Sequence, residues 1–262
     1  MTMVLIAIAA YASAALTLAR RLREEQRLIP AWVWALPAAG ILAHIGAHAW
    51  AWHQAGGANL HIVSALSLVS VGMAALTLLV GLRGQMAALG VIVFPIAAAA
   101  ALAYGALGRH EPSALDWRLQ LHAWCALLAY ATLAIAALLA VLLWLQERAL
   151  RQRRFHGWLR ALPPLIALET LLFRTIAAGF VMLTAALLSG LLFVDDLLAQ
   201  HLAHKTVFSA LSWLAFGALL LGRRLRGWRG ATAVRWTLAA MALLVLAYFG
   251  SNAVLELILK RR

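Results

Sequence analysis

Histidine is the residue type in this chain whose number and spacing could support chemistry. The 262 residues include nine histidines, and His44 and His48 are four apart, so they share one face of a helix. The others lie at positions His53, His61, His110, His122, His156, His201 and His204. Neutral imidazoles can ligate haem iron or a transition metal such as zinc. They can also simply form hydrogen bonds to neighbouring helices.

The composition is that of a protein embedded in a membrane. Hydrophobic residues make up 65% of the chain and charged residues 12%, whereas soluble domains hold about 45–50% and about 25%. These values exclude an ordinary soluble enzyme, a disordered chain and a fibrous repeat. The single cysteine, Cys125, excludes an internal disulfide and a cysteine-based zinc site. The net charge of +13 indicates loops retained in the cytoplasm, and no nucleic-acid partner is expected.

Long apolar stretches predict an all-α fold made of transmembrane helices. A helix needs about 20 apolar residues to cross the hydrocarbon core of a bilayer. We expect eight spans, near residues 2–19, 32–52, 61–82, 86–107, 119–145, 171–194, 206–222 and 233–257. The alternating segments of a β-barrel are not visible in the sequence, and an open sheet edge has no partner in lipid. The predicted fold is therefore one polytopic transmembrane helical bundle over residues 1–262.

Basic residues indicate which ends of the spans face the cytoplasm. In an eight-span bundle, 16 of the 22 Lys and Arg residues fall on one side, and the positive-inside rule assigns that side to the cytoplasm. Both termini are then extracytoplasmic, although Lys260, Arg261 and Arg262 act against this orientation. With this orientation, eight of the nine histidines lie near the extracytoplasmic face, and His156 lies on the cytoplasmic side.

Tryptophans accompany the histidines at the same level of the membrane. They lie at positions Trp50, Trp52, Trp117 and Trp124. Tryptophan is drawn to membrane interfaces, so an aromatic belt explains each of them singly. Ionisable groups in spans are costly and tend to face a cavity or a partner, so the histidine cluster is more informative than its members. The sequence holds no G-x-G-x-x-G after a strand, no P-loop and no H-E-x-x-H motif.

Several short motifs occur in a fixed order from the fifth span to the last. They are Leu121-His122 with Ala129-Tyr130-Ala131-Thr132-Leu133, Gly179-Phe180 through Ser189-Gly190, His204-Lys205, Ser212-Trp213, Arg223, Gly227-Trp228-Arg229-Gly230, and Tyr248-Phe249-Gly250-Ser251-Asn252. This ordered set resembles the cytochrome c assembly family, which includes the haem-handling proteins CcsA and CcmC. The resemblance covers about residues 60–256. The length and the number of spans are most similar to the small HemX-like branch of eight-span inner-membrane proteins.

The resemblance implies a multi-pass protein of the bacterial cytoplasmic (inner) membrane that handles haem near its outer face. In the family's synthases, the histidine that matches His122 is an external axial ligand of the iron. Two family features are missing here. The Trp-rich outer loop corresponds to residues 194–205, which hold no tryptophan, and the external histidine after the last span is replaced by the segment Ala253–Glu256.

The first functional hypothesis is a haem-binding protein that assists cytochrome c maturation or haem homeostasis, without catalysing a bond-making step itself. His122 would ligate the iron, with a second ligand from His61, His201 or His204. Aromatic residues such as Trp124 would cover the porphyrin, and Lys205 or Arg118 would pair with its propionates. Membrane lipids and other membrane proteins of cytochrome c maturation or the haem pathway are the expected partners.

Two alternatives remain open at this stage. A scaffold or regulatory subunit that keeps the fold without binding haem is favoured by the missing tryptophans. Small residues such as those at 97–101 permit close helix packing against another membrane protein. An accessory of metal-ion transport is favoured by His44 and His48, but no acidic path crosses the predicted bilayer.

Overall fold

The computed structural model is an all-α protein. It describes residues 1–24, 29–58, 60–83, 86–108, 116–153, 162–193 and 200–250, with the side chains of 200–204 and 249–250 left out. Helices fill almost all of these ranges, and none of the described residues is in a strand. The chain divides into two compact units, Met1–Leu115 with Ala149–Leu165 and Asp116–Arg148 with Ile166–Arg262. They are described in turn below as unit 1 and unit 2.

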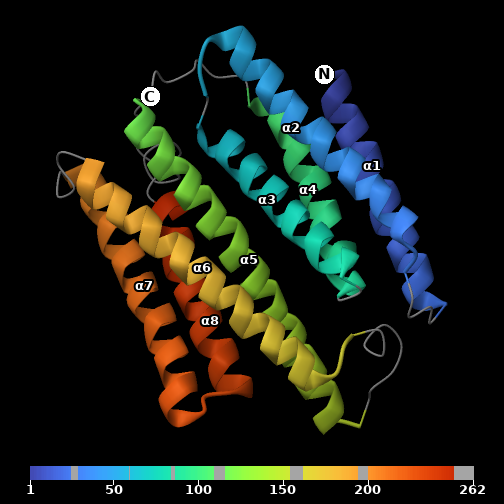
Figure 1. Ribbon diagram of the computed structural model, residues 1–262, viewed down its shortest axis with the longest axis vertical. Helices are drawn as coiled ribbons and strands as arrows, with labels where there is room; N and C mark the ends of the chain where they lie inside the picture. The colour runs from blue at the N-terminus through green and yellow to red at the C-terminus, as the bar shows by residue number, and fades with distance from the viewer. Residues whose placement is uncertain are drawn as a thin grey trace. The chain divides into compact units, whose positions relative to one another are not determined.

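Unit 1 contains four long helices and one short turn of 3-10 helix. They are α1 (Thr2–Arg23), η1 (Ala31–Trp34), α2 (Ala35–Ala55), α3 (Ile62–Leu82) and α4 (Ala87–Leu107). Helix α1 packs on α2 and α4, and α3 packs on the same two helices, so the four form a closed bundle (Figure 1). Small residues allow this close approach. A Cβ atom at Gly40 would lie 3.0 Å from the Tyr11 ring.

Unit 2 is built from α5 (Trp117–Arg151), α6 (Leu165–Phe193), α7 (Gln200–Arg226), α8 (Gly230–Val245) and the π-helical turn η3 (Leu246–Gly250). Side-chain hydrogen bonds join neighbouring helices in the apolar interior. Tyr130 Oη of α5 donates to the Leu244 carbonyl oxygen of α8 at 2.6 Å. Ser212 Oγ of α7 donates to Ala240 of α8 at 2.8 Å. Such bonds fix the rotation of each helix, because an unpaired polar group in this interior is costly.

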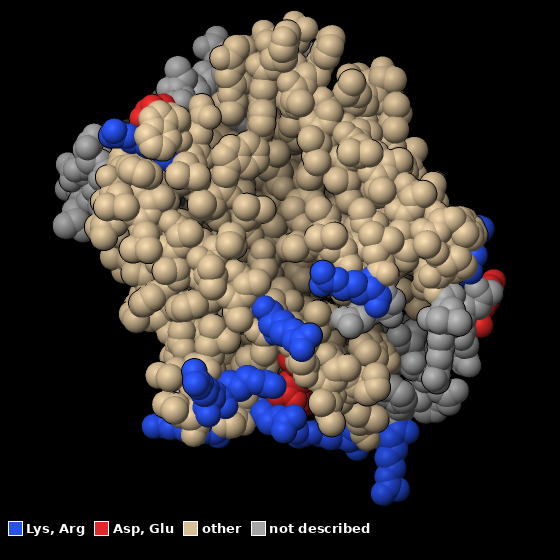
Figure 2. Space-filling model, viewed as in Figure 1, with Lys and Arg blue, Asp and Glu red and all other residues tan. Residues whose placement is uncertain are grey.

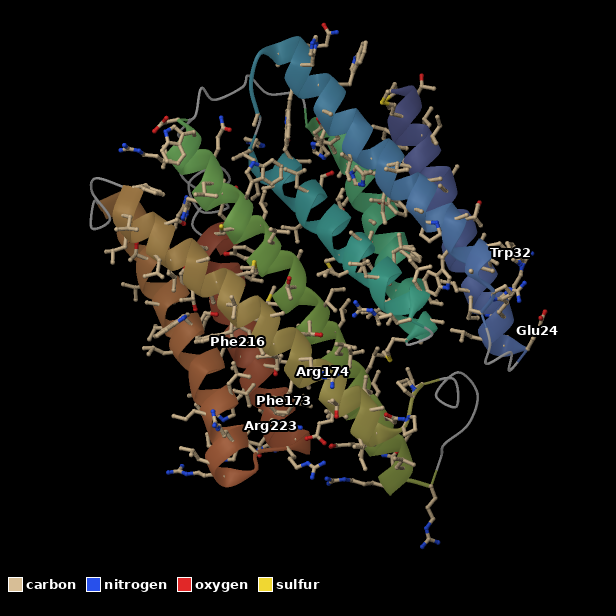
Figure 3. The ribbon with its side chains drawn as sticks, in the orientation of Figure 1. Glu24, Trp32, Phe173, Arg174, Phe216 and Arg223 are labelled. Carbon is tan, nitrogen blue, oxygen red and sulfur yellow. The ribbon has the colours of Figure 1, made fainter. Side chains whose placement is uncertain are left out.

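One end of unit 2 is held by a buried carboxylate. Glu169 of α6 is 5% exposed and accepts hydrogen bonds from Arg223 at 2.9 Å and from Arg229 at 3.1 Å. The Arg223 guanidinium also lies 3.7 Å from the centre of the Phe173 ring, and Figure 3 labels both residues. The hydrogen bond to Glu169 raises the pKa of Arg229. Most of the face shown in Figure 2 carries neither Lys and Arg nor Asp and Glu side chains.

The observed helices match the predicted spans, and most of them extend beyond the apolar residues. Helix α1 continues to Arg23 and α5 to Arg151, because arginine forms helix readily and a helix satisfies its own backbone bonds. Helix α6 begins directly after Pro163-Pro164, where a missing N–H does no harm. The described part of α8 and η3 ends at Gly250, so the predicted extension of this span to residue 257 lies outside the described residues.

Seven of the described helices are long and apolar enough to cross a membrane. They are α1 and α3–α8, with the membrane part of α7 beginning at Lys205 and that of α8 reaching Tyr248. Helix α2 has 21 residues and packs between α1 and α3, but it carries His44, His48 and Gln54, which lower its hydropathy. Eight spans and two extracytoplasmic termini therefore remain predictions. The chain is a multi-pass helical membrane protein.

Candidate functional site

Two imidazoles meet one hydroxyl in the interior of unit 1. His44 is 0% exposed and His48 is 1% exposed, and their Nε2 atoms lie 2.7 Å and 3.0 Å from the Ser67 Oγ atom. The spacing of four residues on α2 places both rings on one face of the helix, as the sequence predicts, and in the structure this face meets α3. The two rings stack on each other with centroids 5.6 Å apart. We call these three residues the His–Ser cluster.

The His–Ser cluster engages both histidines through the same ring nitrogen. The Ser67 hydroxyl has one proton and two lone pairs, so it donates to at most one Nε2 atom and accepts a hydrogen bond from the other Nε2 atom or from both. At least one of the two imidazoles therefore carries its proton on Nε2. Neither Nδ1 atom has a hydrogen-bond partner among the described residues. The cluster therefore joins α2 to α3 through Nε2, and it presents no free Nε2 lone pair to a metal ion.

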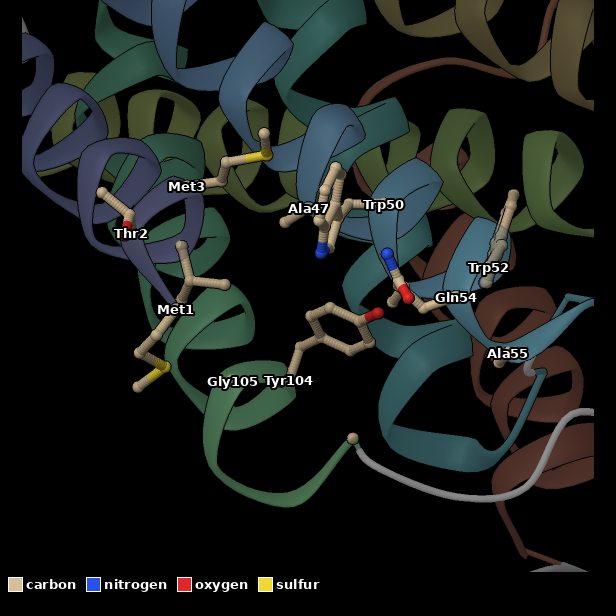
Figure 4. A pocket seen from close by; sticks show the side chains of 13 residues that line it. Met1, Thr2, Met3, Ala47, Trp50, Trp52, Gln54, Ala55, Tyr104 and Gly105 are labelled. Atoms are coloured by element: carbon tan, nitrogen blue, oxygen red, sulfur yellow. The ribbon is translucent and has the colours of Figure 1, made fainter.

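Aromatic rings link the His–Ser cluster to a cavity. The His48 ring stacks on the Tyr104 ring of α4 with centroids 3.9 Å apart, and it also contacts Trp52 at 5.8 Å. Tyr104 and Trp52 line a cavity of about 850 Å³ between the start of α1, the end of α2 and the end of α4 (Figure 4). Ligand pockets usually enclose about 300–1,000 Å³. The cluster thus supports one wall of a cavity that is large enough for a small molecule.

His122 of unit 2 makes a half-buried contact with the neighbouring helix. It lies in the second turn of α5, and its Nδ1 atom lies 2.9 Å from the Ala186 carbonyl oxygen and 3.2 Å from Ser189 Oγ, both on α6. A carbonyl oxygen only accepts hydrogen bonds, so Nδ1 carries the proton and Nε2 keeps its lone pair. No described residue forms a hydrogen bond with Nε2. This half-buried imidazole has the tautomer and the support that an iron ligand requires.

The absence of a side chain at Gly190 lets the His122 ring pack closely against α6. A Cβ atom at Gly190 would lie 3.0 Å from the Cε1 atom of that ring, which is closer than most real Cβ contacts. Gly190 and Ser189 belong to the motif that the sequence singles out after Gly179-Phe180. Between α6 and α7, the Trp213 indole donates to Thr184 Oγ1 at 2.8 Å. The motif residues of α6 and α7 therefore position His122 and fasten the neighbouring helices.

The structure divides the predicted site residues between the two units. His122, Trp124 and Lys205 belong to unit 2, where Trp124 is 42% exposed and Lys205 lies 5.7 Å from the Tyr248 ring. His61 belongs to unit 1, where it directly precedes α3. His201 and His204 fall in the first turns of α7, and their side chains lie outside the described residues, as do His110 and His156. The choice of iron ligands therefore remains a prediction.

Sequence reasoning missed Ser67 of the His–Ser cluster and the two tyrosines that contact its histidines, Tyr104 and Tyr11. Ser64, Ser67 and Ser70 are three residues apart and all buried, and this serine stripe on an apolar helix was the available signal for a polar contact with α2. Tyr11 contacts the His44 ring edge-on at 6.0 Å. No group of three or more His, Cys, Asp or Glu side chains that could hold a metal ion occurs among the described residues.

Comparisons with known proteins identify the family. The model of the family described as cytochrome C assembly protein matches residues 31–259. The inner membrane protein YpjD of Escherichia coli K12 is 33% identical over 208 residues, which is 77% of each chain. An uncharacterized 28.8 kDa protein of Azospirillum brasilense is 34% identical over 143 residues, or 54% of this chain and 53% of that protein.

A shorter match links the chain to a named biogenesis protein. The cytochrome c biogenesis protein CcsA of Prochlorococcus marinus is 30% identical over 87 residues, which is 32% of this chain and 28% of that protein. No solved structure matches. The helical bundle, the family match and the inner-membrane relative agree with each other. The chain is a multi-pass protein of the bacterial inner membrane and belongs to the cytochrome c assembly protein family.

Proposed function

We propose that the protein binds haem through His122 in unit 2 and assists cytochrome c maturation or haem homeostasis. The observation that carries this proposal is the bonding state of the His122 ring. Its Nδ1–H donates to the Ala186 carbonyl at 2.9 Å, so Nε2 is the nitrogen available for iron. Metal-ligating histidines are usually oriented by such a hydrogen bond on the other nitrogen, which also makes the ligand more basic.

The surroundings of His122 in unit 2 fit a porphyrin with two carboxylates. Arg118 lies in the first turn of α5, with its guanidinium 5.6 Å from the Trp117 ring and 5.9 Å from the Phe193 ring. Lys205 lies near the start of α7, and the chain enters α7 at the same end of the unit at which α5 begins. A flat macrocycle needs apolar and aromatic walls with cations at its edge, and these side chains supply both.

Each residue then has a defined part. Haem, when bound, supplies the iron porphyrin that a maturing cytochrome requires. His122 ligates the iron, Ser189 and the Ala186 carbonyl hold the ring, and Arg118 and Lys205 bind the propionates. Trp117 and Trp124 exclude water from one side. A second imidazole from His201 or His204 in α7 belongs to the same proposal.

The relatives support this function at the level of the family. The Prochlorococcus protein is named for cytochrome c biogenesis, and it covers a part of this chain. The loss of the Trp-rich loop distinguishes this chain from the synthases that it resembles. We therefore propose binding and transfer of haem, with other membrane proteins of cytochrome c maturation as the partners, and no bond-making step by this chain.

An absorption spectrum of the purified protein tests the proposal. The full chain is purified in detergent, supplemented with haem, and compared with His122→Ala and with His53→Ala, which changes an exposed histidine of α2. We expect a specific Soret band that shifts or weakens in His122→Ala and is unchanged in His53→Ala. A wild-type protein without a specific Soret band, or equal spectra for the two variants, would refute haem binding at His122. The former result would favour the scaffold hypothesis.

A further inference from the structure

The cavity of unit 1 has a lining that differs in kind from the surroundings of His122. Its walls include Trp50, Trp52 and Tyr104, together with the small residues Ala47 and Ala51. The floor continues into a packed apolar cluster of Val4, Ala101 and Tyr104. Binding in such a site is most favourable for a ligand that buries a large apolar or aromatic surface.

Polar groups in the cavity are few, and no charged side chain is among them in the described residues. The lining holds no Asp, Glu, Lys, Arg or His side chain among the described residues. The Tyr104 hydroxyl points into the cavity on the side of Gln54 (Figure 4). A phenol and an amide can both donate hydrogen bonds to an oxygen of a ligand. The α-amino group of Met1 is the one ionisable cation in the described lining, so at least one of the two carboxylates of haem would have no cationic partner there, and its burial would be costly.

The wall on which a ligand would rest is rigid. Tyr104 is 8% exposed, and its ring is fixed by the stack on His48 at 3.9 Å. His48 is in turn held by the hydrogen bond to Ser67 at 3.0 Å. A ligand that binds a fixed ring loses less free energy to ordering of the protein. The buried histidines of unit 1 therefore have a positioning role, and they need not touch the ligand themselves.

We propose that this cavity binds an uncharged, lipid-soluble ring compound with carbonyl groups, of the quinone class. Trp50, Trp52 and Tyr104 contact the faces of the ring. The Tyr104 hydroxyl and the Gln54 amide donate hydrogen bonds to its carbonyl oxygens. Such a molecule reaches the cavity from the membrane, where its concentration is high. This site is separate from the haem site proposed at His122.

Quenching of tryptophan fluorescence by a benzoquinone with a short isoprenoid tail measures this binding. The full chain is reconstituted in lipid nanodiscs. Ala51→Phe fills the cavity, and Ala49→Phe adds the same ring on α2 at an exposed residue outside the lining. We expect saturable quenching whose Kd rises at least about tenfold in Ala51→Phe and is unchanged in Ala49→Phe. Tyr104→Phe keeps the ring and removes one hydrogen bond, so it should raise Kd by about threefold to tenfold.

Three controls separate this proposal from its alternatives. Thermal unfolding of each variant shows that the fold is retained, and His122→Ala should bind the quinone with wild-type affinity. A naphthoquinone sulfonate should bind at least about tenfold more weakly than the neutral quinone, because the mostly apolar lining holds no charged side chain that would replace the hydration of the sulfonate. Absence of saturable quenching, equal Kd values for Ala51→Phe and Ala49→Phe, or equal affinity for the sulfonate would overturn the proposal.

Discussion

Replacing Ser67 by alanine tests whether the His–Ser cluster holds unit 1 together. Ser67→Ala removes the one oxygen that both Nε2 atoms share, at 2.7 Å and 3.0 Å. Hydrogen bonds between membrane helices are worth about 0.6 kcal/mol on average and up to about 1.7 kcal/mol. Two such bonds give an expected loss of about 1–3 kcal/mol in the free energy of unfolding.

Ser64→Ala is the matched control for this measurement. Ser64 lies one turn earlier on the same helix, is also 0% exposed, and has no hydrogen-bond partner among the described residues. Both variants delete one buried oxygen atom, so both should lose a similar amount of packing. The difference between their free energies of unfolding therefore measures the two hydrogen bonds of Ser67. Reversible unfolding in mixed micelles with an anionic denaturing detergent gives both free energies. A difference below about 0.5 kcal/mol would refute the role of the cluster.

Two further substitutions probe unit 2. Arg223→Leu should lower the melting temperature in detergent more than Arg229→Leu does. The Arg223 side chain is 32% exposed and that of Arg229 is 59% exposed, and solvent screens the more exposed ion pair. A larger loss in Arg229→Leu would contradict this reasoning. Gly190→Ala should reduce haem occupancy, measured by the Soret band, because its Cβ atom would meet the His122 ring at 3.0 Å. Gly217→Ala, whose Cβ atom would lie 3.4 Å from the Phe180 ring, should leave the band unchanged.

The fold follows from the sequence because lipid restricts the backbone so strongly. An apolar stretch of about 20 residues has no stable alternative to a helix in a bilayer, and α3 and α4 begin and end within one residue of the predicted spans. The ends of α1, α5 and α6 were less predictable, because arginine and glutamate continue a helix into the interface without an apolar signal. The sequence identified the motif around Ser189-Gly190 only as part of the ordered set that resembles the family, and the structure places that motif against His122.

The contacts inside unit 1 could not be predicted in the same way. The spacing of His44 and His48 indicates a shared face, but it does not identify the helix that the face meets. The partner helix is set by tertiary packing, because Ser67 lies 23 residues after His44 and 19 residues after His48 in the sequence. Tyr104 carried no signal of its own, because a tyrosine near the end of a span is typical of an interfacial belt. The cavity lies where the start of α1 and the ends of α2 and α4 meet. The residue pattern along one helix does not predict how the ends of three helices pack together.

The histidines of the two units differ in which ring nitrogen forms hydrogen bonds to the protein. In unit 1 the Nε2 atoms of His44 and His48 both bind Ser67, so a metal ion would have to displace a buried hydrogen bond to reach them. In unit 2 the protein engages Nδ1 of His122, and Nε2 keeps its lone pair. Counting histidines therefore overstates the number of potential ligands. The hydrogen bonds of each imidazole engage Nε2 of His44 and His48 in helix packing, and they leave Nε2 of His122 for the iron binding that we propose.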